Sequence, residues 1–193
     1  MNRPATASRM AMVPGPRLSG WVDRFRTSHG AVHSDFHEDN LLLTAADGTT
    51  ALLKAPWPVD GRPGRGSNDV ERLAAMAGQE RGLGLVLVRR GGFALAAASG
   101  PLILASATGK RHEEAKVTAG QAASLFAGNR IEYIVPGGDR TLVDQVLAHP
   151  ALKAFAGRTR LALLDVQEPK AANLAKAAAD ACSVRITVSD PRN

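Results

Sequence analysis

The first strong pattern in the chain is an apolar stripe at helical spacing within residues 16–29. Pro16 suits the first turn of a helix, and Gly30 suits the position just beyond its end. The pattern therefore predicts an amphipathic helix near the N-terminus. Its apolar positions are Leu18, Trp21, Val22 and Phe25.

Short β-prone runs follow this helix. Asp47-Gly48 separates residues 41–44 from residues 50–54, and Asp-Gly between two such runs predicts a β-hairpin. The middle of the chain then predicts a three-stranded meander. Its strands cover residues 84–89, 93–98 and 102–107, with turns at Gly91-Gly92 and Gly100-Pro101.

Helical and extended patterns alternate in the second half of the chain. Pro136-Gly137-Gly138 predicts a turn, and Asp139 predicts the N-cap of the helix that follows it. The predicted helices, one of which precedes the meander, cover residues 69–78, 113–127, 139–147, 150–156 and 169–182. The predicted strands cover residues 131–135, 161–164 and 184–188.

These elements predict an α/β fold, with a mixed sheet flanked by helices and an N-terminal helix plus β-hairpin element alongside. We expect three segments. Residues 1–55 form the N-terminal element, residues 56–68 a Pro- and Gly-rich linker, and residues 69–193 the α/β core, all packed together as one compact unit.

Composition adds a charge argument to this fold. The 193 residues carry a net charge of +6, and the sequence pI is about 10.1. Such a domain attracts polyanions, above all RNA, although the same surplus also keeps a protein soluble. The N-terminal residues 1–12 resemble neither a signal peptide nor a membrane anchor, so we expect a cytoplasmic protein. The single cysteine, Cys182, is expected to be a buried structural residue.

Basic residues cluster around the meander and the segment that follows it. Together they predict one phosphate-binding surface, to which Arg62 and Arg65 of the linker would add. The alternative is scattered, solvated charge. The candidate nucleic-acid-binding residues are Arg89, Arg90, Lys110, Arg111, His112 and Lys116.

Two further groups of residues allow a ligand. His33, Asp35 and His37 alternate, so on a strand they share one face and could hold a metal ion for a small hydrolase. A polar strand edge or loop explains them better, and we predict no metal. Residues 135–139 could receive an anion at a helix start, but the negative charge of Asp139 favours an ordinary turn and N-cap.

Four collinear segments resemble the Vms-like release factor family of actinobacteria, which is similar to the middle domain of archaeal and eukaryotic class I release factors. They are Gly20-Trp21-Val22-Asp23-Arg24-Phe25, Leu87-Val88-Arg89-Arg90-Gly91-Gly92-Phe93-Ala94, Gly137-Gly138-Asp139-Arg140 and Val184-Arg185-Ile186-Thr187-Val188. The resemblance extends over about residues 12–190. It implies a release-factor middle-domain fold and hydrolysis of peptidyl-tRNA on stalled ribosomes without a cofactor. The partners that it implies are tRNA and the large-subunit peptidyl-transfer centre.

The resemblance also implies a catalytic loop that carries Gly and Gln, after the third strand of the meander. Only residues 108–114 stand there, and none of them is a Gln, so no catalytic residue can be named. Either a mobile loop belongs between His112 and Glu113, or the protein lacks it and binds tRNA or the ribosome without chemistry. We expect the loop, because a segment shaped to fit the ribosome has no core to pack on. Gly120-Gln121 lies in a helical pattern and is expected to be structural.

Overall fold

The computed structural model describes residues 8–37, 40–110 and 115–191. The chain divides into two compact units. The terminal unit combines residues 1–79 with residues 182–193, and the central unit comprises residues 80–181. Each unit has its own sheet and its own apolar core.

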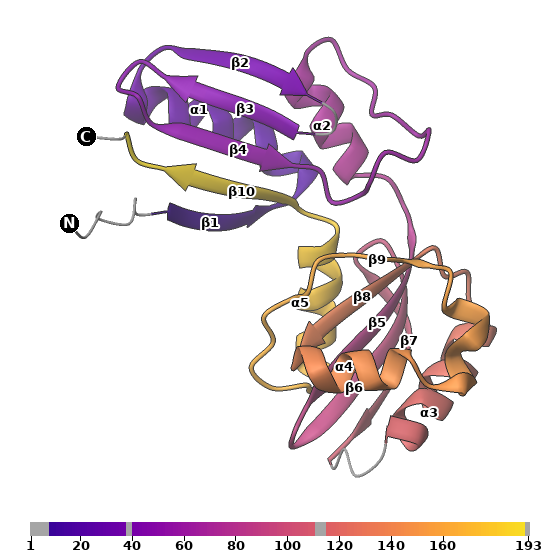
Figure 1. Ribbon diagram of the computed structural model, residues 1–193. Helices are drawn as coiled ribbons and strands as arrows, with labels where there is room; N and C mark the ends of the chain where they lie inside the picture. Colours follow the sequence, from indigo (N-terminus) through magenta and orange to yellow (C-terminus); the bar gives the residue numbers. More distant parts are fainter. Residues whose placement is uncertain (1–7, 38–39, 111–114, 192–193) are drawn as a thin grey trace. The chain divides into compact units, whose positions relative to one another are not determined.

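The described part of the terminal unit contains a five-stranded antiparallel sheet in the order β1-β10-β4-β3-β2 (Figure 1). The last strand of the chain, β10, therefore lies between the first strand and the predicted hairpin. The strands are β1 (Ser8–Val13), β2 (Val32–His37), β3 (Asn40–Ala45), β4 (Thr50–Lys54) and β10 (Val184–Ser189).

Helices cover one face of this sheet. The 3₁₀ turn η1 (Gly15–Arg17) leads into α1 (Leu18–His29), and α2 (Asp69–Ala77) packs beside them. Burial alternates along β3 and β4, so that every second side chain enters the core beneath the helices. The buried core includes Leu18, Val22, Phe25, Leu41, Leu43, Leu53, Leu73 and Ile186.

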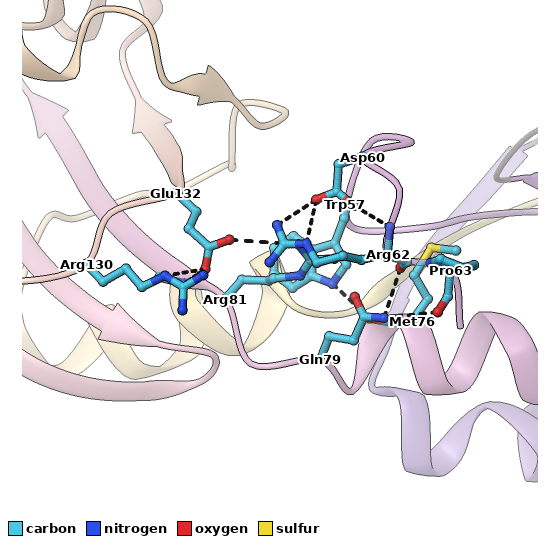
Figure 2. A network of polar contacts seen from close by, with 10 residues as sticks. Trp57, Asp60, Arg62, Pro63, Met76, Gln79, Arg81, Arg130 and Glu132 are labelled. Carbon is cyan, nitrogen blue, oxygen red and sulfur yellow. Dashed lines mark hydrogen bonds and ion pairs between the residues drawn. The ribbon is translucent and has the colours of Figure 1, made fainter. Parts of the chain in front are cut away.

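Two hydrogen bonds join the loop between β4 and α2 to the C-terminal end of α2 and the residues just after it. The Trp57 indole Nε1 donates to the Met76 carbonyl at 2.9 Å, and the Gln79 amide donates to the Arg62 carbonyl at 3.0 Å (Figure 2). Asn68 caps α2, because its side-chain oxygen accepts from the Glu71 backbone N–H at 2.9 Å. The predicted linker therefore has hydrogen bonds near its start, in its middle and at its end.

The central unit contains a mixed sheet in the order β7-β6-β5-β8-β9. β5, β6 and β7 form the predicted antiparallel meander, whereas β8 pairs with β5 in parallel. The strands are β5 (Gly82–Arg89), β6 (Gly92–Ser99), β7 (Leu102–Gly109), β8 (Tyr133–Gly138) and β9 (Thr159–Arg160).

Helices lie on both faces of the central sheet (Figure 1). α3 (Ala115–Ala127), α4 (Arg140–Leu147) and the 3₁₀ helix η2 (Pro150–Phe155) share one core, in which the Phe126 and Phe155 rings meet edge to face at 5.4 Å. α5 (Ala171–Ala181) contacts β5, β6 and β7, and its buried residues stand outside that core. α5 therefore covers the opposite face.

A buried charge network holds the start of β5 to the segment before β8. The Arg81 side chain is only 1% exposed, and its guanidinium lies 3.8 Å from the Glu132 carboxylate (Figure 2). Arg130 lies 3.3 Å from the same carboxylate, which also accepts the Gly82 backbone N–H at 3.2 Å. Two guanidinium groups and one backbone N–H thus compensate the partial desolvation of the Glu132 carboxylate.

The mixed α/β class is confirmed, and most predicted elements are present with ends shifted by a few residues. Asp139 does cap α4, since its carboxylate accepts from the Leu142 N–H at 3.2 Å. Two interpretations were wrong. Residues 136–138 continue β8 rather than forming a turn, and residues 161–164 contribute only one bridge, Gly137 to Leu164.

The arrangement also differs from the predicted domain limits. In the terminal unit, α2 packs on α1, and β10 pairs with β1 and β4. Both elements belong to the terminal unit, although the sequence placed them in residues 69–193. Two sheets therefore stand where one mixed sheet with an attached hairpin was predicted.

Gly138 ends β8 in the left-handed backbone region, with φ at +90°. A Cβ added there would stand 2.3 Å from the Val88 carbonyl oxygen. We expect Gly138→Ala to lower the free energy of unfolding by about 1–3 kcal/mol from backbone strain, with the steric clash in addition. Urea denaturation measures the change. The control is Gly128→Ala, because a Cβ added at Gly128 would contact nothing. This control should change the free energy of unfolding by less than about 0.5 kcal/mol. An equal change in both variants would contradict strain at Gly138 as the cause.

The His29 ring nitrogen Nδ1 lies 2.8 Å from the Asp47 carboxylate, and this contact joins the end of α1 to the β3–β4 turn. The His29 hydrogen bond, followed by the Thr49 backbone N–H at 2.8 Å, lowers the pKa of Asp47. The ionised carboxylate therefore stabilises the fold above the unfolded-state pKa of about 4, and this stability is lost as pH falls through the lower, folded-state pKa.

Asp47→Asn should consequently lower the melting temperature at pH 7. We expect the gap between the wild type and this variant to stay constant above about pH 5 and to shrink below about pH 4. Thermal melts from pH 2 to pH 8 measure it. A gap that is as wide at pH 2 as at pH 7 would rule out the carboxylate as its source.

Candidate nucleic-acid interface

Three strands of the central sheet end at the same edge. β8 is parallel to β5, and β7 runs in the same direction because β6 is antiparallel to both of its neighbours. Glycines let the start of β6 approach the end of β7 closely at this edge. A Cβ on Gly92 would stand 2.4 Å from the Gly109 carbonyl oxygen, and a Cβ on Gly109 would stand 2.4 Å from the Phe93 ring.

A cleft of about 830 Å³ opens at this edge, within the central unit. The β5–β6 turn, the end of β7 and the segment entering α5 line it. This is the location at which open α/β sheets generally receive ligands, beyond the carboxyl ends of parallel strands. The charged side chains that line the cleft are Arg89, Arg90, Lys110, Lys170, Asp139 and Glu168.

Arg89 is held in place from its far side. Its Nε donates to the Val166 carbonyl at 2.6 Å, and its terminal nitrogen lies 3.5 Å from the Asp165 carboxylate. Asp165 is 80% exposed, so water screens this ion pair strongly. The contacts thus orient the guanidinium more than they neutralise it.

The remaining charges of the cleft divide into paired and unpaired groups. Lys170 forms an ion pair with Glu168, and Asp139 is engaged as the N-cap of α4. Arg90 and Lys110 are exposed and have no ion-pair partner in the part of the chain that the structure describes. Two cations at the mouth of the cleft are therefore available to an external anion, and the first turn of α5 adds the positive end of its dipole.

The structure brings together half of the predicted basic surface. Arg89, Arg90 and Lys110 line one cleft, whereas Lys116 is exposed on α3 and does not line it. Arg111 and His112 lie outside the described residues. The sequence-based prediction omitted Lys170, whose signal was its position directly after Pro169 at a helix start.

The other candidates have ordinary structural positions. His33 and Asp35 are exposed on β2, while the side chain of His37 is not described. Searching residues 8–37, 40–110 and 115–191 finds no group of three His, Cys, Asp or Glu side chains fit for a metal ion. Cys182 is buried, and burial raises the pKa of its thiol to about 12, which keeps it protonated and unreactive at neutral pH.

The expectation of an additional catalytic loop between His112 and Glu113 is wrong. Glu113 follows His112 directly, so the connection between β7 and α3 consists of Lys110-Arg111-His112-Glu113-Glu114 and contains no glutamine. Gly120-Gln121 lies inside α3, as expected, with Gln121 exposed on the surface of the helix.

Comparison with known proteins finds a family match for the later part of the chain. Residues 112–187 match the model of the actinobacteria/chloroflexi VLRF1 release factor family. The resemblance to this release factor family is thereby confirmed for the segment from α3 to β10. The matched segment includes Asp139, Glu168 and Lys170 of the cleft, while the β5–β6 turn precedes it.

No curated protein matches the chain. In the described residues, no helix has both the length and the apolar character needed to cross a membrane.

Proposed function

We propose that this chain is a release-factor-like protein that docks on the ribosome by binding the phosphates of tRNA or ribosomal RNA in the central-unit cleft. The observation that carries the proposal is the convergence of Arg89, Arg90 and Lys110 at one sheet edge, next to the segment that matches a release factor family. The net charge of +6 supports an RNA partner.

The cleft has the chemistry that phosphate binding requires. Arg89 is oriented by its contacts to Val166 and Asp165, which reduces the entropy lost when it grips an anion. Arg90 and Lys110 supply charge that no described acid neutralises. At about 830 Å³ the space is large enough for a nucleotide rather than for a single small ion.

Peptidyl-tRNA hydrolysis in the rescue of stalled ribosomes is the finer prediction from the family resemblance. That reaction depends on a mobile Gly-Gln tip that orients water and stabilises charge at the ester. The connection from β7 to α3 has no glutamine, and Gln121 is held within the rigid helix α3. We therefore propose docking without hydrolysis by such a tip.

Charge reversal at the mouth of the cleft tests the docking proposal. We expect Arg90→Glu/Lys110→Glu to weaken binding to fluorescently labelled tRNA and to ribosomes at least tenfold at about 0.1 M salt. The slope of log affinity against log salt should fall by about 1 for each phosphate that the variant no longer binds. Fluorescence anisotropy and ribosome co-sedimentation measure these effects.

The matched control is Lys153→Glu/Arg158→Glu, which makes the same change in charge on exposed residues of the central unit that do not line the cleft. This control should lower affinity only slightly. If both double variants weaken RNA binding equally, the net charge of the protein explains the binding and the cleft is not the binding site.

The absence of hydrolysis is tested on peptidyl-tRNA and on stalled nascent-chain complexes. We expect the purified chain to cleave the ester no faster than the uncatalysed reaction does, as measured by the gel mobility of the tRNA. Gln121→Ala serves as the control. Cleavage that this variant abolishes would show that Gln121 is catalytic and would overturn docking alone as the function.

A further inference from the structure

The antiparallel sheet of the terminal unit has a second face, opposite α1 and α2, which we call the open face. The strand registers bring alternate residues of each of the five strands to this face. None of these side chains belongs to the buried core beneath the helices. The residues of the open face include Met10, Leu42, Leu52, Lys54, Arg185 and Thr187.

Two cations stand directly opposite each other on the two inner strands β10 and β4, in the row at one end of the open face. Arg185 on β10 pairs in register with Lys54 on β4, and both strands have a neighbouring strand on their other side. Like charges placed directly opposite on neighbouring strands repel and destabilise a sheet. Neither side chain has an ion-pair partner within the residues described.

The surroundings of this pair would not relieve the repulsion. Met12 lies beside Arg185, and Asn40 lies beside Lys54 in the same row across the sheet. The described acid of this face is Asp35, which stands in the next row on the edge strand β2. The pair of cations therefore lowers the stability of the free protein and is complementary in charge to an external anion.

The rest of the open face fits an extended partner rather than a single ion. Met10 is 69% exposed and Leu42 is 38% exposed, and they lie in one row with Thr187 and Leu52 between them. The next row presents hydroxyl groups from Ser189, Thr50 and Thr44. Cations, hydroxyl groups and apolar patches in parallel rows match the phosphates, 2′-hydroxyls and riboses of RNA.

We propose that the open face is a second RNA-binding surface, in which Lys54 and Arg185 bind the phosphates of one RNA strand. Among its described side chains there is no Phe, Tyr or Trp, so bases have no stacking platform. The surface therefore reads the sugar–phosphate backbone and not the base sequence. It belongs to the terminal unit, outside the cleft of the proposed function and its cations.

The test is the variant Lys54→Gln/Arg185→Gln, assayed with labelled tRNA by fluorescence anisotropy. We expect affinity to fall about fivefold to twentyfold at about 0.1 M salt and the salt slope to fall by about 0.9 for each phosphate released from the face. The melting temperature should stay equal or rise, because the repulsion is removed. A purely structural role for the two residues would instead lower it.

Two further variants separate position from charge. Arg17→Gln/Arg24→Gln removes two exposed cations from the helical side of the terminal unit, and we expect it to change tRNA affinity less than twofold. Lys54→Arg/Arg185→Lys keeps both charges on the open face and should retain affinity near the wild-type value. A loss with the helical-side variant as large as with the open-face variant would overturn the proposal.

Acetylation of surface lysines, followed by mass spectrometry, locates the contact independently. Bound tRNA should protect Lys54 severalfold while leaving exposed Lys153 of the central unit unchanged. The proposal would be refuted if Lys54→Gln/Arg185→Gln bound tRNA with wild-type affinity and if bound tRNA did not protect Lys54 from acetylation. It would also fail if Lys54→Gln/Arg185→Gln weakened binding to whole ribosomes but to neither naked tRNA nor naked ribosomal RNA, because the partner would then be a protein. The cleft variant Arg90→Glu/Lys110→Glu, run in the same assay, shows whether the proposed function stands separately.

Discussion

The close approach of strand ends at one edge of the central sheet is the constraint on which the candidate interface depends. Gly92 and Gly109 sit where a Cβ would collide with a facing carbonyl or ring, and Gly138 adds a left-handed backbone that returns the chain toward α4. Because these positions lack side chains, the start of β6 approaches the end of β7, and the end of β8 approaches the end of β5. Arg89, Arg90 and Lys110 are consequently presented from rigid strand ends rather than from long loops.

The distribution of ion pairs distinguishes structural charge from available charge. Arg81 is buried and shares Glu132 with Arg130, so its charge helps to hold β5 against the segment before β8. Arg90, Lys110, Lys54 and Arg185 have no described counterion, although acids are frequent in the chain. In both units, cations that lack a counterion among the described residues stand on the sheet or at its edge, and this pattern is typical of proteins that bind polyanions.

Local signals in the sequence were reliable where a short segment decides its own conformation. The apolar stripe of residues 18–25, the Asp47-Gly48 turn and the Asp139 cap were all predicted, because spacing, turn chemistry and capping act within a few residues. The Pro-Gly-Gly run at residues 136–138 was misread as a turn. Parallel pairing with β5 extends β8 through it, and a distant strand thus overrides the local preference.

Residue patterns alone were sufficient for the α/β class, the meander, the basic balance and the resemblance that the family match confirms for residues 112–187. The additional loop expected between His112 and Glu113 was wrong, because these residues are adjacent in the chain and no glutamine stands between β7 and α3. The folded chain was needed to show that β10 crosses to the N-terminal sheet, that Lys170 joins Arg89 at one cleft, and that Arg185 faces Lys54. Each of those pairings joins segments that lie far apart in the sequence, and no local pattern encodes which surfaces bury one another best.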